Sequence, residues 1–247
     1  MAPGLITLPA FADRKDGVWH FFGTRHRPAG PASDAASVTE GTLGDRAPGD
    51  PVAVVSVKQV HGTDALVLDR PVKVGETIAG GWDALITNRP QVLLTVRTAD
   101  CVPVLVHDPM SKVVAAVHAG WRGAIAGILP KTLSILRRRF GSNLLRMQIG
   151  IGPSVGPCCY EVDEPVLERL RAGFPDWRTV IREVGGGKAM LDLQDLLWRQ
   201  AASAGVPEEQ IRTVRVCTVC HPALFYSYRR EGTVLGTMVS GIMRTRR

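Results

Sequence analysis

Short apolar runs rich in β-branched residues recur along this chain, and each run ends at a Gly, Asp or another turn former. Such runs predict β-strands at residues 17–25, 51–61, 64–69, 83–88, 91–98, 112–118, 144–152, 211–219 and 237–243. Apolar residues at helical spacing, followed by Gly, predict helices at 121–140, 163–174 and 190–205. In a chain of 247 residues this alternation indicates a single α/β domain over residues 1–247.

One stretch departs from this pattern. Residues 27–51 are rich in Gly, Pro, Ala, Ser and Asp and show no apolar periodicity. This composition is typical of a surface loop, and we expect an irregular connection there within the single domain.

Three candidate metal ligands stand where predicted strands end. They are His61 in VKQVHGTD, Cys101 in VRTADCVP and His118 in AAVHAGWRG. Two imidazoles and one thiolate suit Zn²⁺, and a tetrahedral ion with three protein ligands keeps a position for water or substrate. The alternative is that they are inert, since six histidines and five cysteines leave some beside apolar runs by chance.

Charge and composition narrow the classes of partner. The net charge of +7 comes mainly from scattered Arg, without a basic stripe interleaved with aromatics, so we expect no nucleic-acid partner. An anionic small substrate fits the same charge. The sequence shows no export signal and no run near the roughly 18 apolar residues of a membrane span, which predicts a cytoplasmic protein with reduced cysteines and no membrane partner.

Three other patterns resemble cofactor or metal sites, but their local sequence does not favour those sites. GIGPSVG resembles a dinucleotide fingerprint, but Pro153 and Pro157 would break the helix that it requires. CTVCH matches haem-attachment spacing without an export signal, and its Cys217, Cys220 and His221 form at most a weak second metal candidate. The adjacent Cys158 and Cys159 should diverge in an extended segment, so we expect buried thiols that do not share an ion.

Six ordered motifs resemble one known family, and the resemblance spans most of the chain. The motifs are VKQVHGTD, DALIT, TADCVPVL, AAVHAGWRGA, IGPSVGPCCYEV, and CT followed by LFYSYRR. In this order they are similar to the YfiH/laccase-domain family, whose members are also described as polyphenol oxidases or LACC1-like purine nucleoside phosphorylases. The segment after Arg25 keeps little of the family's usual pattern, so a helix and its substrate or subunit contacts are in doubt there.

The resemblance implies an α/β fold with one mixed-sheet domain of the YfiH/cysteine-hydrolase-like type. It also implies Zn²⁺ bound by His61, Cys101 and His118, with no organic cofactor. The implied activities are phosphorolysis of adenosine, inosine, guanosine and methylthioadenosine, and deamination of adenosine. The implied partners are therefore a purine nucleoside and phosphate. The protein itself is expected to be a monomer or a homodimer.

Phosphorolysis needs cations for phosphate and a proton donor for the departing purine. Arg25, Lys58 and Arg229 are the phosphate candidates because each lies in a family-like motif at a predicted strand end. The usual His-x-Glu signature of zinc deaminases is absent, so Asp100, beside Cys101, is the candidate for proton transfer. Each of these four residues could equally be structural. Further candidates are Gln59, His107 (more simply a surface turn residue), Ser227, and Trp121 with Arg122 at the start of the long helix.

The same residues fit other functions. Without a metal, Cys101 and a histidine would suit a cysteine hydrolase. Editing of a peptidoglycan precursor is a second hydrolytic alternative. A multicopper oxidase is disfavoured because six histidines are too few for several coppers. A zinc-stabilised binding module would instead close its metal with a fourth ligand, such as Cys217 or Cys220.

Overall fold

The protein is described by a computed structural model that covers residues 5–11, 17–26, 53–73, 76 and 78–245. The predicted irregular loop at 27–51 lies outside the described residues. Within the described residues no helix is both long and apolar enough to cross a membrane.

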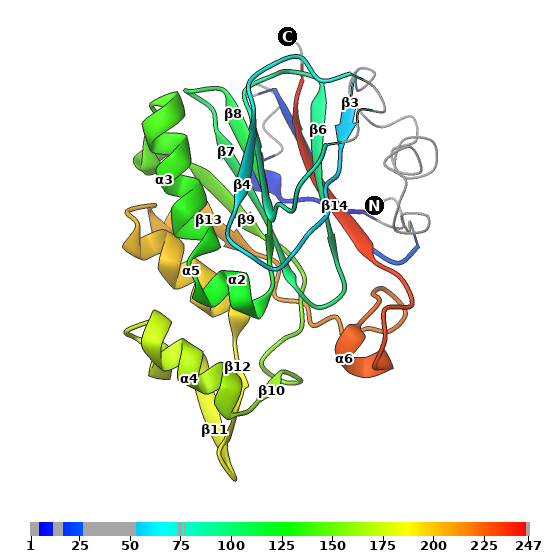
Figure 1. Ribbon diagram of the computed structural model, residues 1–247, viewed down its shortest axis with the longest axis vertical. Coiled ribbons are helices and arrows are strands. Elements are labelled where there is room, and N and C mark those ends of the chain that lie inside the picture. Colours follow the sequence, from blue (N-terminus) through cyan, green and yellow to red (C-terminus); the bar gives the residue numbers. More distant parts are fainter. Residues whose placement is uncertain (1–4, 12–16, 27–52, 74–75, 77, 246–247) are drawn as a thin grey trace.

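A six-stranded mixed sheet forms the centre of the protein (Figure 1). Its order is β13-β9-β7-β8-β5-β4, with antiparallel pairing at the centre and parallel pairs β4–β5 and β9–β13 at its two edges. The strands are β4 (Ala65–Leu68), β5 (Ala84–Thr87), β7 (Val102–Asp108), β8 (Val113–Ala119), β9 (Gln148–Ile151) and β13 (Ile211–Thr213). Every residue of β5, β7 and β8 is buried, including the polar Thr87, His107 and Asp108. Strand β7 was not among the predicted strands.

A second sheet of five strands has the order β1-β2-β14-β6-β3. Its strands are β1 (Leu5–Ile6), β2 (Val18–Gly23), β3 (Ala53–Val55), β6 (Val92–Thr98) and β14 (Met238–Arg244). A third, small antiparallel sheet lies apart from both (Figure 1) and consists of β10 (Glu161–Val162), β11 (Ile181–Gly185) and β12 (Lys188–Leu191).

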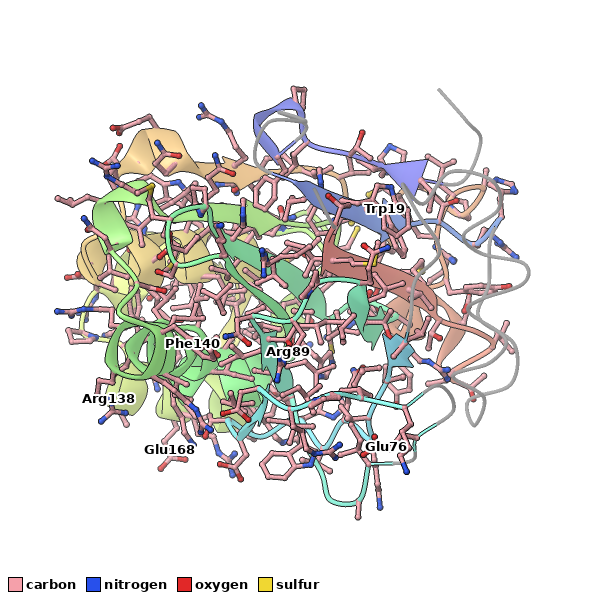
Figure 2. The ribbon with its side chains drawn as sticks, turned by 90° about the horizontal axis from the view of Figure 1, so that it is seen from above. Trp19, Glu76, Arg89, Arg138, Phe140 and Glu168 are labelled. Carbon is pink, nitrogen blue, oxygen red and sulfur yellow. The ribbon has the colours of Figure 1, made fainter. Side chains whose placement is uncertain are left out.

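Three helices, α2 (Trp121–Ile125), α3 (Ile128–Phe140) and α5 (Leu193–Ser203), pack against one face of the six-stranded sheet, and the five-stranded sheet covers the other (Figure 1). Helix α4 (Glu164–Gly173) packs beside α2, and the short α6 (Tyr228–Glu231) lies apart from these helices. Figure 2 shows the resulting layers from above, with Phe140 at the end of α3 and Trp19 on β2 on opposite sides of the molecule. The mixed-sheet α/β prediction is therefore confirmed.

Strand alternation divides the core in two. Ile86 of β5 packs in a cluster with Leu129 of α3, whereas its neighbour Leu85 packs in a second cluster with Leu94 of β6 and Ile242 of β14. The first cluster binds the helices to the central sheet, and the second binds the two sheets together. The two sheets thereby bring the carboxyl end of β6 and the end of β8 near one another.

Several predicted elements differ in their bounds. The predicted helix at 121–140 is two helices, because Gly127 adopts a left-handed φ of 81° between α2 and α3. The strand predicted at 51–61 is confirmed only for β3. The helix predicted at 190–205 begins later, at Leu193, because residues 188–191 form β12. Irregular backbone that leads into a turn replaces the second half of the strand predicted at 211–219.

Candidate active site and metal centre

Three separate segments bring His61, Cys101 and His118 together. His61 lies in the loop after β3, Cys101 in the turn between β6 and β7, and His118 near the end of β8. Their ligand atoms all lie within 4.8 Å of one another. The two imidazole rings meet edge to face, with their centroids 4.8 Å apart. The grouping of these three side chains is thus confirmed.

Asp83, which directly precedes β5, organises two of the three side chains. Its Oδ1 lies 2.8 Å from Nδ1 of the buried His118. The same carboxylate accepts hydrogen bonds from the backbone amides of Val60, His61 and Gly62. It thereby fixes both the His118 ring and the loop that carries His61, whose φ is 60°. Sequence analysis missed this role, although Asp83 opens the DALIT motif.

The bond to Asp83 also determines which His118 nitrogen is available. Burial opposes charge on Asp83, but hydrogen bonds from His118 and from the amides of Gly62 and His61 hold the pKa of this carboxyl below its usual range. An ionised carboxylate only accepts hydrogen bonds, so Nδ1 of His118 donates. Nε2 is then left to act as a metal ligand or as a base, an arrangement common around metal-bound histidines.

Glycines allow helix α2 to approach the ligands. A Cβ on Gly120 would lie 2.7 Å from Cδ2 of His61 and 3.2 Å from Sγ of Cys101. A Cβ on Gly123 would lie 2.5 Å from the carbonyl oxygen of Gly62. Both glycines of the HAGWRGA motif are therefore required for close packing, a role that the sequence alone did not reveal.

The two histidines favour the thiolate of Cys101. Burial raises the pKa of this thiol, but hydrogen bonds with His118 and His61 outweigh burial and lower it to about 7. Burial opposes a charge on His118 as well, yet its hydrogen bonds with Asp83 and Cys101 raise its pKa to about 9. The site can therefore hold either a metal ion or a thiolate–imidazolium pair.

A pocket of about 820 Å³ opens directly onto the three side chains. Its cationic lining residues are Lys58, Arg97, Arg122 and Arg229. Its aromatic lining residues are Trp121, Tyr160 and Tyr228. The pocket has the volume of a typical small-molecule site, and it combines ligand atoms, positive charge and flat apolar surfaces.

Comparison with known proteins identifies the family. The model of the family described as multi-copper polyphenol oxidoreductase laccase matches residues 37–245. The chain belongs to this laccase family. It is 38% identical over 199 residues to a purine nucleoside phosphorylase of Bacteroides thetaiotaomicron, covering 78% of this chain and 74% of that protein. It is 34% identical over 197 residues to the adenosine deaminase RL5 of an unknown prokaryotic organism, covering 77% and 75% respectively.

The fold is similar to that of a solved structure as well. The crystal structure of the hypothetical protein YfiH from Bacillus licheniformis matches with a TM-score of 0.87 and 27% identity, over 98% of this chain and 97% of that one. The predicted membership of the YfiH/laccase-domain family is thereby confirmed, together with its fold.

The laccase family's name implies copper, and the donor set tests that implication. The described residues include all six histidines. Among these residues, the groups that could hold an ion are His61–Cys101–His118 and a cluster of four cysteines. The first group fits one tetrahedral ion with an open position. Neither group provides the several histidine-rich centres of a multicopper oxidase.

Only two of the three predicted phosphate-binding residues line the pocket in this member of the laccase family. Lys58 and Arg229 line the pocket. Arg25 is not among the lining residues; its Nη1 donates to the Pro222 carbonyl at 2.6 Å, and its guanidinium lies 4.9 Å from the ring centroid of Tyr226. Arg25 therefore binds the segment that contains Pro222 and Tyr226. The other two cationic residues of the pocket are Arg97 and Arg122.

Asp100 lines the pocket, but its carboxylate is committed to the protein. Oδ1 accepts from the Thr218 hydroxyl at 2.5 Å, and Oδ2 accepts from the Ser227 hydroxyl and from the Arg229 amide. Asp100 itself has a φ of 88°. The residue beside Cys101 therefore joins the turn of the metal centre to the start of α6, in line with its alternative interpretation as a turn or capping residue.

The weaker candidates take mainly structural positions. Gln59 lines the pocket, but both ends of its amide group bond to the backbone of Arg97. Ser227 caps α6 by accepting from the Arg230 amide. His107 is buried in β7 beside Gln148, so its interpretation as a surface turn residue was wrong. Trp121 and Arg122 begin a helix of only five residues, not the long helix that was expected.

The cysteine expectations need correction. Cys158 and Cys159 lie in a turn after β9 rather than in an extended segment. Their sulfurs converge with those of Cys217 and Cys220, whereas His221 is outside the group and faces the Cys217 carbonyl. Adjacent side chains diverge only where the backbone is extended, and here it is not.

Proposed function

We propose that this chain is a zinc-dependent purine nucleoside phosphorylase that also deaminates adenosine. The observation that carries the proposal is one pocket in which the His61–Cys101–His118 group adjoins four cationic and three aromatic side chains. The names of the similar proteins support this choice of substrate class. Adenosine, inosine, guanosine and methylthioadenosine are the proposed nucleosides.

Zinc is the proposed metal because imidazole and thiolate are both common ligands of Zn²⁺, and three protein ligands leave the open fourth position of a catalytic zinc site. Bound there, Zn²⁺ would supply a Lewis acid and lower the pKa of a water molecule at its open position. Asp83 prepares the set by holding His118 with Nδ1 engaged and Nε2 available.

The positive residues of the pocket bind phosphate in this proposal. Lys58 and Arg229 come from distant parts of the sequence, and Arg122 lies over Trp121 with 4.5 Å between its Cζ and the ring centroid. Several cations around one anion favour phosphate, and Arg presents paired donors to its oxygens. Asp100 acts here as a positioning residue, because it holds the amide of Arg229 rather than reaching a substrate proton.

The aromatic residues bind the nucleoside. Trp121 and Tyr160 offer flat faces for a purine, and the Arg229 guanidinium lies 5.2 Å from the centroid of Tyr160. Burial, and then the nearby Cys101, raise the pKa of Tyr160 well above its usual range, so its hydroxyl stays protonated. Tyr160 can therefore donate a hydrogen bond to the leaving purine when the bond between C1′ and the base nitrogen breaks and a phosphate oxygen bonds to C1′.

The test is phosphate-dependent release of free base from adenosine and inosine by purified protein, with metal analysis of the same sample. We expect base release that requires phosphate, ammonia release from adenosine without phosphate, and zinc in the active preparation. Zinc without turnover of any nucleoside would overturn the proposal and favour editing of a peptidoglycan precursor or a binding role.

A second candidate, a cysteine hydrolase, is favoured by one observation. Cys101, His118 and Asp83 are linked in the order nucleophile, base and orienting carboxylate. His61 separates the two candidates, because it is a ligand in the first and dispensable in the second. His61→Ala should abolish metal binding and phosphorolysis together, whereas a metal-free wild-type enzyme with hydrolytic activity that survives His61→Ala would favour the hydrolase.

We also propose that the chain is one domain and works in the cytoplasm as a monomer or homodimer. All five cysteines are unpaired in the structure, which suits a reducing compartment. Gel filtration with light scattering, and fractionation of the source cells, test these two points.

A further inference from the structure

Four cysteines from two distant segments meet at a single point away from the proposed catalytic group. Cys158 and Cys159 lie in the turn after β9, and Cys217 and Cys220 lie in the segment after β13. All four Sγ atoms lie within 4.8 Å of one another. Cys220 Sγ is 3.6 Å from that of Cys158 and 3.4 Å from that of Cys159.

These spacings match a tetrahedral metal site. Zinc–sulfur bonds of about 2.3 Å at tetrahedral angles place the sulfurs about 3.8 Å apart. A disulfide requires about 2.0 Å between its sulfurs, and all four cysteines are unpaired. The spacing of Cys217 and Cys220, with two residues between them, is also that of ligand pairs in structural zinc sites.

The backbone around the cluster is arranged to receive a thiolate. The Gly156 amide donates to Cys217 Sγ at 3.2 Å. A Cβ on Gly156 would lie 3.1 Å from Cβ of Cys217 and 3.3 Å from Sγ of Cys158, so a side chain there would crowd the cluster. Amide donors that surround a ligating sulfur are the usual supporting contacts of such sites.

The cluster also has a structural task that a bound ion would serve. Ser154 and Cys217 form an isolated parallel bridge between the two segments. Thr218, next to Cys217, bonds to Asp100, and Tyr160, next to Cys159, lines the pocket. An ion held by all four sulfurs would therefore fasten together two walls of the proposed active site.

We propose that Cys158, Cys159, Cys217 and Cys220 bind a structural Zn²⁺ ion in a closed four-thiolate site. Binding replaces the water ligands of the hydrated ion by four thiolates and releases the thiol protons to solvent, and it needs no oxidant. The site is separate from His61–Cys101–His118 and does not depend on the reaction proposed for that group.

The test uses the Cys101→Ala chain, purified under reducing conditions. Because the protein has five cysteines, every thiol left in this variant belongs to the cluster. We expect about one zinc per chain, and X-ray absorption should show four sulfur neighbours at about 2.3 Å. Thiol titration should proceed slowly and release the zinc in step.

Two further samples keep the result decisive. His221→Ala, added to Cys101→Ala, is the matched control, since this exposed histidine is adjacent to Cys220 but outside the cluster, and zinc should be retained. Growth of the Cys101→Ala chain with Co²⁺ should give the strong thiolate-to-cobalt absorption of a four-sulfur site. Metal-free protein with four rapidly reacting thiols, a disulfide by mass, or nitrogen and oxygen neighbours around the zinc would each overturn the proposal.

Discussion

The His61–Cys101–His118 group and the four-cysteine cluster differ in donor number, chemistry and access. The first offers three mixed donors from three segments and opens onto a pocket of about 820 Å³. The second offers four sulfurs from two turns, and none of its cysteines lines that pocket. An ion in the first keeps a position for a reactant, whereas an ion in the second has none.

The difference teaches that, within one fold, the number of donors decides whether a metal group can serve a reaction or only stabilise the structure. The open group depends on Asp83, which fixes a ring and a loop from outside the ligand set. The closed cluster relies on the Gly156 amide, which belongs to one of its own segments. Loss of an ion should therefore affect turnover at the first and folding at the second.

The largest expected effect is a contrast in turnover and Tm between two variants, Cys101→Ala and Cys220→Ser. Cys101→Ala should reduce nucleoside turnover more than about 100-fold, because loss of a ligand exceeds the 10- to 100-fold effect of losing its supporting partner. Its Tm should change by less than about 2 °C, while Cys220→Ser should lower Tm by roughly 5 °C or more. Calorimetry and steady-state kinetics on both variants check this, and equal losses of Tm would contradict the comparison.

Metal removal should occur in two stages. A water-soluble chelator should first take the ion of the open group and abolish turnover, with Tm nearly unchanged, and added Zn²⁺ should restore activity. A thiol-specific mercurial should then release the second ion and lower Tm. A zinc indicator follows the release of each ion. Simultaneous release of both ions would show that the two sites are not independent.

Asp83→Asn should weaken metal binding at the open group by about 10- to 100-fold. The amide replaces an acceptor by a donor that faces the amides of His61 and Gly62, so the His61 loop loses a partner as well. Competition with a chelator of known affinity measures the change. Zinc in the cysteine cluster serves as the internal control and should be retained.

Gly120→Ala should lower turnover by about tenfold, because displacing a catalytic group by about 1 Å can lower the reaction rate by up to about 100-fold. The new methyl group would push against His61 and Cys101. Gly62→Ala is the matched control in the same region, because its Cβ would meet ordinary contacts of 3.5 and 3.6 Å. Similar kinetics for the two variants would remove the steric explanation.

The smallest expected effect is that of Ser227→Ala. It removes the cap of α6, worth about 1 kcal/mol, and one of the hydrogen bonds on Asp100. Arg229 should then be less well placed, so KM for phosphate should rise a few-fold while kcat stays nearly constant. Ser227→Thr should rescue KM, and a fall in kcat alone would indicate a different role.

Sequence patterns predicted the chemistry best where a side chain stands at or just after the end of an apolar strand. His118 lies near the end of β8 and Cys101 follows β6, and the two were placed together correctly. Asp83 was missed because a carboxylate before a strand has the same sequence appearance as an ordinary turn residue. Only the fold shows that it faces three amides and a ring.

The errors arose where backbone direction changes within a few residues. Cys158 and Cys159 were assigned to an extended segment, yet the turn at residues 157–159 brings their sulfurs together. Gly127 divides a helix whose apolar spacing is continuous across it. Arg25 was expected at a phosphate, but its partners lie almost 200 positions later in the chain, beyond what a local pattern can indicate.

Strand β14 has a consequence for how this protein is made. It is the last strand that the structure describes, yet it lies between β2 and β6 and pairs with both. During translation the earlier strands emerge first, so each of these two must wait with an unpaired edge until residues 238–244 arrive. The nascent chain therefore passes through an aggregation-prone interval that lasts until β14 has emerged, when a chaperone that shields strand edges would help it most.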